Sequence, residues 1–298
     1  MKYVSILIIV LFTASCSNTK KAIEGQPESK EILVPSQTPD VIKHPIKPEI
    51  PKTTEDNNSI EISLGEDGTI SDNGISETTE IIYTEAFDHG LFSTLLKKHV
   101  TDSGGVNYKG FKSESRALQN YIDLLKAYQP TEDWDKNDKI AYWINAYNAL
   151  TIDLIIRNYP TKSIKDIKDP WDQRLWKFGN KWQNLNDIEH KILRNMNEPR
   201  IHFAIVCASV SCPKLQNEAF TALNIEAQLV KATKEFLNDT SKNKLSEDRI
   251  QLSKIFKWFK RDFENSGSLI DFLNLYTDIK ISSKAKKSFM DYNWNLND

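Results

Sequence analysis

DKIAYWINAYNALTIDLIIRNY, residues 138–159, is the stretch that decides the fold. Apolar side chains fall on most faces of a helical wheel through this stretch, a pattern typical of a helix that is buried on all sides. The next residue, Pro160, has no backbone N–H and therefore ends the helix. We expect a buried central helix here, with the other elements of the domain on either side of it.

Helical spacing of apolar residues also predicts shorter helices along the rest of the domain. They are expected over 86–100, 113–128, 186–194, 224–239 and 268–276, with a short turn or helix over 163–167. Asn186 is the candidate N-cap of the helix over 186–194. Asp187 and Glu189 would then fall in its first turn, where the helix dipole favours acidic side chains.

Strand signals are fewer than helix signals. RIHFAIVCA (200–208) is apolar and rich in β-formers, and it reads as a buried strand that ends at Cys207. LWKFGNKWQNL (175–185) predicts a hairpin with Gly179 and Asn180 at the turn, and DRIQLSKIF (248–256) predicts a strand that leads into a helix. The predicted class is α+β, a helix-rich single domain around a small β-sheet.

The overall composition is that of a globular protein and excludes several function classes. Of the 298 residues 39% are hydrophobic and 27% are charged, and the formal net charge is −2. Without a basic excess we expect no nucleic-acid partner. Three cysteines are too few for a disulfide framework, and no window near 20 apolar residues would support a multi-span membrane protein.

The N-terminal part of the chain looks like a targeting segment followed by a tether. Residues 1–15 have the charged start and short apolar core of a signal peptide. Small residues before Cys16 resemble the lipobox of bacterial lipoproteins, although an ordinary signal peptide with Cys16 nearby by chance is the alternative. Residues 16–80 are rich in Pro, Ser, Thr and Glu and are expected to be disordered, leaving a globular domain over 81–298.

Cys207 is the candidate nucleophile. A catalytic thiol needs a lowered pKa, which a neighbouring imidazole can supply, although position alone favours an inert core cysteine. His190 is the candidate base and Glu189 the candidate orienter; on a regular helix their side chains diverge by about 100°, which favours a surface pair instead. His202 competes as base, but on an extended strand it would lie about 16 Å from Cys207 and on the opposite face.

Five polar residues are candidates for supporting this site: Asn145, Asn148, His202, Ser209 and Cys212. Buried amides on the central helix must be hydrogen-bonded, so the two asparagines form a structural network, hold the loop after the cysteine, or donate to an oxyanion.

Cys212 leaves two further alternatives open. It could form a disulfide with Cys207 across the short intervening loop. A metal site made from His190, His202 and the two cysteines is disfavoured, because C-x4-C spacing departs from the usual zinc patterns. We expect no metal and no other cofactor.

Several motifs together resemble one protein family. They are AYWINAYNAL (141–150), SIKDI (163–167), LNDIEHKILR (185–194), PRIHFAIVCASVSCPKL (199–215) and LSKIFKWFKRDF (252–263), with GGVNYKGF (104–111) and DYNWNLND (291–298) at the two ends. In order and spacing they resemble the DUF547 family over roughly residues 85–298. The resemblance implies a core motif of IEH, FAxxC and SxP, and a fold similar to papain-like or transglutaminase-like cysteine hydrolases.

These observations lead to one main functional hypothesis and two alternatives. The main hypothesis is a lipid-anchored protein of the bacterial cell envelope in which Cys207 attacks an amide or ester carbonyl, with His190 as base and Glu189 as its charge partner. The substrate would be an envelope peptide crosslink, an isopeptide or a small amide. The alternatives are a binding or scaffold module without turnover, and a thiol-redox protein that uses Cys207 and Cys212.

Overall fold

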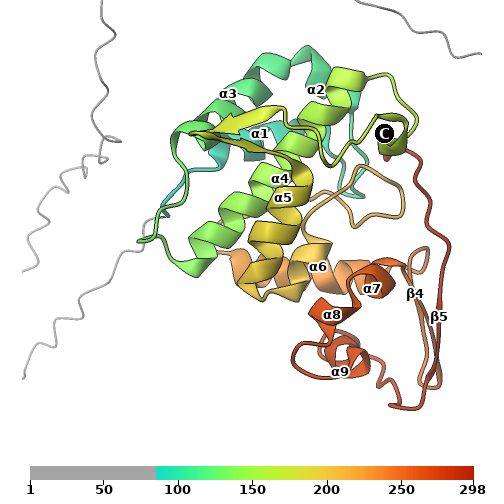
Figure 1. Ribbon diagram of the computed structural model, residues 1–298. Coiled ribbons are helices and arrows are strands. Elements are labelled where there is room, and N and C mark those ends of the chain that lie inside the picture. The colour runs from blue at the N-terminus through green and yellow to red at the C-terminus, as the bar shows by residue number, and fades with distance from the viewer. Residues whose placement is uncertain (1–84) are drawn as a thin grey trace, which may run out of the picture. The chain divides into compact units, whose positions relative to one another are not determined.

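The computed structural model describes residues 85–298. The expected signal peptide, the lipidation site Cys16 and the expected tether lie outside the described residues. The described part combines helices with small β-sheets, as the predicted α+β class requires (Figure 1). None of the helices in this part of the chain is both long and apolar enough to cross a membrane.

The central helix is confirmed. Helix α4 (Lys136–Asn158) is buried along nearly its whole length, with Asp135 capping its first turn and Pro160 just beyond its end. From the N-terminal part of the described chain, α2 (Tyr108–Ser113) and α3 (Ser115–Ala127) pack on α4, and α1 (Gly90–His99) packs on α2 and α3. Figure 1 shows α4 at the middle of this group. Together these helices bury the larger of two hydrophobic clusters.

The C-terminal half adds short elements around a second, smaller hydrophobic cluster. Its helices are α6 (Ile225–Asn238), α7 (Ile255–Trp258), α8 (Lys260–Phe263) and α9 (Leu269–Asn274). Predicted helices over 224–239 and 268–276 are thereby confirmed. The short turn expected over 163–167 is the 3-10 turn η1 (Ile164–Asp166).

The strands form two separate sheets instead of one. The predicted hairpin is present as β1 (Trp176–Phe178) and β2 (Lys181–Gln183), and Gly179 at its turn has a φ of 55°, which glycine adopts freely. The second sheet pairs β4 (Arg249–Leu252) antiparallel with β3 (Lys244–Leu245) and parallel with β5 (Lys286–Phe289). Strand β4 leads towards α7, as predicted.

The predicted strand over 200–208 is wrong. The chain there forms the 3-10 turn η4 (Pro199–Phe203) and then an irregular loop. Its apolar side chains are buried because the segment runs between the two hydrophobic clusters: Ile201 belongs to the larger and Phe203 to the smaller. A short apolar run satisfies both a strand and a buried turn, so periodicity alone could not separate them.

The segment that was predicted as a helix over 186–194 is divided. It begins with the single turn α5 (Leu185–Asp187), continues as the π-helical turn η2 (Ile188–Leu193) and ends in the 3-10 turn η3 (Arg194–Met196). The N-cap is Asn184, whose side chain accepts the Asp187 N–H at 2.7 Å, and not Asn186 as predicted. The Asn186 side chain is therefore not occupied by capping.

Residues 291–298, here called the C-terminal segment, lie along several loops of the domain. The Val210 N–H donates to the carbonyl of Asn295, and the Leu296 N–H donates to that of Lys162. Ser209 and Leu296 form an isolated antiparallel bridge. The C-terminal segment is thereby fixed beside the loop that follows Cys207.

Candidate active site

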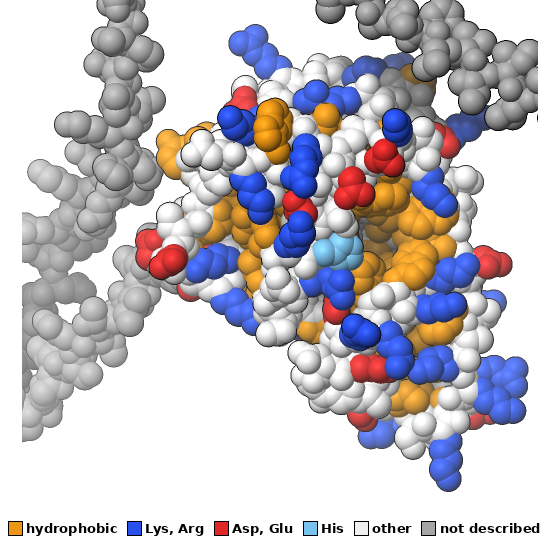
Figure 2. Space-filling model, viewed as in Figure 1, with side chains coloured by type: hydrophobic (Ala, Val, Ile, Leu, Met, Phe, Trp, Pro, Cys, Tyr) orange, Lys and Arg blue, Asp and Glu red, His pale blue; other side chains and the backbone are white. Residues whose placement is uncertain are grey.

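A pocket of about 300 Å³ brings together Cys207, Cys212, His190, His202 and Glu189. The other predicted site residues, Asn145, Asn148 and Ser209, are not among its lining residues. Its walls come from α4, the loop before β1, the α5–η2 region, the segment from η4 to Pro213, helix α7 and the C-terminal segment. The lining residues are Tyr147, Trp171, Asp172, Asn186, Glu189, His190, His202, Ile205, Cys207, Cys212, Pro213, Ile255, Trp258, Phe259, Tyr292 and Trp294. On the face drawn in Figure 2, hydrophobic side chains line a hollow beside a histidine.

The Cys207 thiol is half-buried and lies among polar groups. Its sulfur is 3.2 Å from the Ser209 hydroxyl, 3.1 Å from the Cys212 sulfur and 3.3 Å from the Tyr292 hydroxyl. Both cysteines are free thiols. The hydrogen bond with Cys212 is the largest cause that lowers the pKa of Cys207. The hydrogen bonds to Ser209 and Tyr292 lower it further, and the three together outweigh burial, which raises it. Cys207 is therefore more acidic than an ordinary thiol, as a nucleophile requires.

Cys212 has the opposite character. It is buried, and burial raises its pKa well above the ordinary value of a thiol. Its sulfur accepts the backbone N–H of Cys207 at 2.9 Å. The pair therefore consists of an accessible, acidic thiol and a sealed, weakly acidic one in hydrogen-bond contact.

The loop that carries Cys207 is held from α4. The Asn148 side chain donates to the Ala204 carbonyl at 2.9 Å and accepts the Val206 N–H at 3.0 Å. Asn148 thus fixes the loop before Cys207, not the loop after it. The Asn145 side chain makes the same pair of hydrogen bonds elsewhere: it donates to the Phe220 carbonyl and accepts the Phe220 N–H. Both amides belong to a structural network, and neither is among the residues that line the pocket around Cys207.

Ala208, directly after Cys207, has a φ of 56°. This left-handed conformation is unfavourable for a residue with a Cβ and persists only where surrounding contacts impose it. The contacts here are those of Asn148 on one side and of the C-terminal segment on the other, since the Asn297 N–H donates to the Ala208 carbonyl at 3.4 Å. The backbone conformation around Cys207 is therefore held by hydrogen bonds both before and after this residue.

His202 is the imidazole with a carboxylate partner. Its Nε2 lies 2.8 Å from Oδ2 of Asp262, and its ring stacks on Phe259 with 3.9 Å between ring centroids. Within residues 85–298 its other ring nitrogen, Nδ1, has no hydrogen-bond partner. Burial lowers the pKa of His202 although Asp262 opposes this, so the ring is neutral at pH 7 and able to accept a proton.

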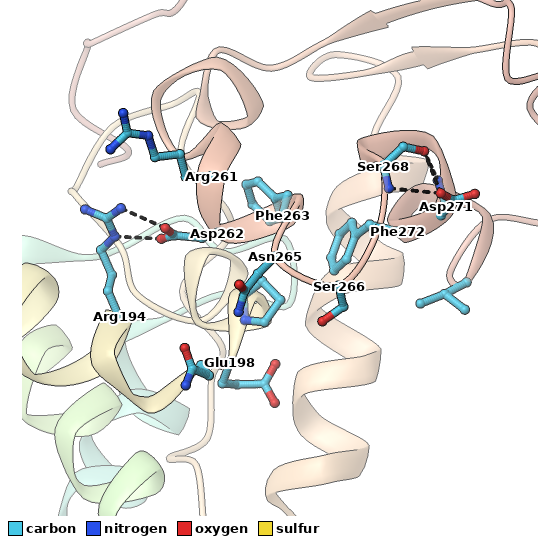
Figure 3. Close-up of a pocket in the computed structure, with 14 residues that line it drawn as sticks. Arg194, Glu198, Arg261, Asp262, Phe263, Asn265, Ser266, Ser268, Asp271 and Phe272 are labelled. Atoms are coloured by element: carbon cyan, nitrogen blue, oxygen red, sulfur yellow. Dashed lines mark hydrogen bonds and ion pairs between the residues drawn. The ribbon is translucent and has the colours of Figure 1, made fainter.

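Asp262 is held in turn by Arg194. Figure 3 shows the two side chains joined by two hydrogen bonds, of 2.6 Å and 2.7 Å. Burial alone would raise the pKa of Asp262, but His202 and Arg194 hold it well below its usual value. The carboxylate stays ionised and fixes the orientation of the imidazole.

His190 and Glu189 line the same pocket but do not contact each other. Nδ1 of His190 is 2.9 Å from a guanidinium nitrogen of Arg194, so this nitrogen accepts and His190 has no carboxylate to orient it. Glu189 is buried and accepts one hydrogen bond, of 3.1 Å, from the Tyr147 hydroxyl. Burial raises the pKa of Glu189 to about 7, against the effect of that hydrogen bond.

Sequence reasoning did not find Asp262 or Tyr292. They lie in LSKIFKWFKRDF and DYNWNLND, two motifs that contributed to the family resemblance but were assigned no role. Asp262 is 60 residues from His202 along the chain, and only the packing of α8 against η4 joins them. The available signal was that both motifs carry polar residues between aromatic ones.

A second pocket, of about 480 Å³, is lined by both Arg194 and Asp262 and is drawn in Figure 3. Its lining residues include Glu198, Asn265 and Ser266 but no cysteine and no histidine, so this pocket has neither a thiol nucleophile nor an imidazole base. Across residues 85–298, no cluster of three or more His, Cys, Asp or Glu side chains could hold a metal ion.

Comparison with known proteins identifies the middle of the chain. Residues 131–237 match the family described as "Protein of unknown function, DUF547". This match covers the central helix and the segment with Glu189, Cys207 and Cys212, and it confirms the resemblance found from the motifs. Neither a curated protein nor a solved structure matches the chain.

Proposed function

Because residues 131–237 belong to the DUF547 family, whose function is unknown, we propose a function from the chemistry of the pocket. The proposed activity is cysteine-dependent acyl transfer or hydrolysis, with Cys207 as nucleophile, His202 as general base and Asp262 as the group that orients it. The observation that carries the proposal is that Cys207 and the Asp262-bound His202 line one pocket.

The proposed reaction follows the usual course of a thiol nucleophile. The Cys207 proton passes to Nδ1 of His202, and the sulfur attacks the carbonyl carbon of an amide or ester. The resulting oxyanion collapses to a thioester as His202 returns the proton to the leaving amine or alcohol. Water, deprotonated by the same imidazole, then hydrolyses the thioester. Asp262 stabilises the imidazolium that forms in each half of the cycle.

This assignment differs from the sequence-based one in its base. His190 was ranked first because His202 and Cys207 were placed on one extended strand, and that strand is not present. The carboxylate partner that a catalytic imidazole needs lies beside His202, whereas His190 faces Arg194. A papain-like fold remains part of the proposal, and its support is the resemblance of the motifs to the DUF547 family.

Alkylation of Cys207 in the purified protein tests the proposal. We expect iodoacetamide to modify Cys207 below pH 7, where an ordinary thiol reacts slowly. His202→Gln should slow this reaction about tenfold at pH 6.5, because the neutral imidazole that accepts the thiol proton is lost. His190→Gln is the matched control and should change the rate less than about twofold.

Turnover is tested with an activated ester such as p-nitrophenyl acetate. A burst of one nitrophenolate per chain, with an acetyl group on Cys207, would support acyl transfer, and Cys207→Ser should abolish it. Reaction of Cys207 only above about pH 8.5 would contradict the proposal. A large effect of His190→Gln, with none of His202→Gln, would return the role of base to His190.

A second candidate function is favoured by one specific contact, the 3.1 Å between the sulfurs of Cys207 and Cys212. In thiol–disulfide exchange Cys207 would attack a substrate disulfide, and Cys212 would displace the reduced substrate while the two cysteines become oxidised to a disulfide. Cys212→Ser separates the two functions: it would abolish reduction of a model disulfide and leave the acyl-transfer burst in place.

The N-terminal sequence is the basis of a proposal for where in the cell the protein is located. We propose export and lipid anchoring at Cys16, supported by the lipobox-like residues before it. Loss of the chain from the membrane fraction in a Cys16→Ser variant would support the anchor, and unchanged fractionation would contradict it.

A further inference from the structure

The charges that line the active-site pocket are of one sign. Glu189 and Asp172 contribute carboxyl groups, and no lysine or arginine is among the described lining residues. The nearest guanidinium, that of Arg194, is engaged by Asp262 and His190. An anionic substrate would meet no lysine or arginine among these lining residues, whereas a positively charged one would meet the carboxylate of Asp172.

Asp172 is the acidic group that is open to a ligand. It is exposed at the edge of the pocket, and within residues 85–298 its carboxylate has neither a hydrogen bond nor an ion pair. Burial and Arg194 lower the pKa of His190, and the charge of Asp172 opposes this together with that of Asp262. Asn186, released from capping, adds a side-chain amide without a hydrogen-bond partner in the described chain.

The wall beside Asp172 is aromatic. The rings of Tyr292 and Trp294 are 4.6 Å apart between centroids, and Trp171 packs edge-on against Trp294 at 5.9 Å. Faces of such rings attract cations. The wall already does so within the protein, since Nζ of Lys165 lies 5.2 Å from the centre of the Trp294 ring.

We propose that this pocket selects acyl substrates that carry a positively charged amino group, with Asp172 as the counter-ion and the rings of Trp171, Tyr292 and Trp294 as the packing surface. The inference rests on the proposed function, because it names the substrate class of the same pocket. An amide of a diamine, or a peptide with a free amino group near the reacting carbonyl, has this chemistry.

Charge-selective alkylation of Cys207 tests the inference without requiring turnover. Three reagents are compared on the full-length protein: iodoacetate, iodoacetamide, and an iodoacetamide that carries a primary ammonium group. Each rate is divided by the rate of the same reagent with free mercaptoethanol, and modification is assigned to Cys207 by peptide mass. We expect the ammonium reagent to be favoured about fivefold over iodoacetamide at low salt, and iodoacetate to be disfavoured.

Two variants make the result specific. Asp172→Asn should bring the ratio of the ammonium reagent to iodoacetamide close to one. Asp278→Asn removes the same charge from an exposed position outside the pocket and should leave the ratio as in the wild type. Equal ratios in the wild type and in Asp172→Asn, or faster reaction with iodoacetate, would overturn the inference. If the charge preference is found but the acyl-transfer burst is not, the proposed function fails and the pocket's selectivity stands.

Discussion

Glu189 is a single residue whose protonation affects the pKa of the Cys207 thiol. Its carboxyl is buried in the pocket wall with one hydrogen bond, from Tyr147, and burial raises its pKa to about 7. Its ionised form raises the pKa of Cys207. Protonation of Glu189, whose pKa is about 7, therefore favours the Cys207 thiolate.

The raised pKa of Glu189 predicts a pH-dependent stability difference. In the unfolded chain this carboxyl has a pKa near 4.5, so between pH 4.5 and 7 the folded state holds a proton that the unfolded state has lost. The contribution of Glu189 to the free energy of unfolding is fully present below pH 4.5 and is lost as pH rises through 7. Glu189→Gln has no such titration. As pH rises from 4.5 to 8, its free energy of unfolding should therefore gain about 3 kcal/mol relative to that of the wild type.

Urea unfolding of both proteins at several pH values measures this difference. The wild-type curve alone would not suffice, because lowered pKa values of His190 and His202 make stability rise with pH in part of the same window. Subtracting the two curves removes these contributions, which both proteins share. A difference that stays constant from pH 4.5 to 8 would contradict the prediction.

At the scale of elements, α4 acts as a clamp with two equivalent amides. Asn148 and Asn145 each make two hydrogen bonds to buried backbone groups, and only Asn148 grips the chain next to Cys207. Replacing either by alanine leaves two buried backbone groups unpaired and should cost about 2–4 kcal/mol. We expect equal losses of stability, but a slower alkylation of Cys207 only in Asn148→Ala.

Thermal unfolding and iodoacetamide labelling measure the two effects, under conditions in which circular dichroism shows both variants folded. Asn145→Ala serves as the control for a general loss of stability. Equal slowing of labelling in both variants would mean that the clamp on the loop before Cys207 has no special effect on the thiol.

The same elements show what the sequence could predict. Long helices such as α4 have many periodic positions, so the apolar pattern and Pro160 were sufficient to predict this helix. The run 200–208 has too few positions to distinguish a strand from a buried 3-10 turn, and its conformation depends on two clusters formed by distant segments. Cys207 was proposed because it ends an apolar run, and Glu189 because it precedes a candidate base, His190. Asp262 reaches His202 only through tertiary packing.

At the scale of the molecule, the pocket joins the two hydrophobic clusters. Tyr147 and Cys207 border the larger cluster, while Ile255 and Phe259 border the smaller one. The arrangement of Cys207, His202 and Glu189 around this pocket therefore exists only while both clusters are packed. This arrangement implies that the two clusters of the described domain unfold together, because η4 contributes side chains to both.

A pair of cavity-forming substitutions tests this coupling. Phe256 is fully buried in the smaller cluster, 4.9 Å from the Phe263 ring, and Phe92 is fully buried in the larger cluster, stacked 4.8 Å from Tyr121. Replacing either phenylalanine by alanine should cost about 3–5 kcal/mol. If the clusters unfold as one unit, Phe256→Ala should speed amide hydrogen exchange in α4 as much as Phe92→Ala does, per unit of stability lost. Exchange in α4 that is unchanged by Phe256→Ala would show that the smaller cluster opens on its own, and the site would then be lost before the domain unfolds.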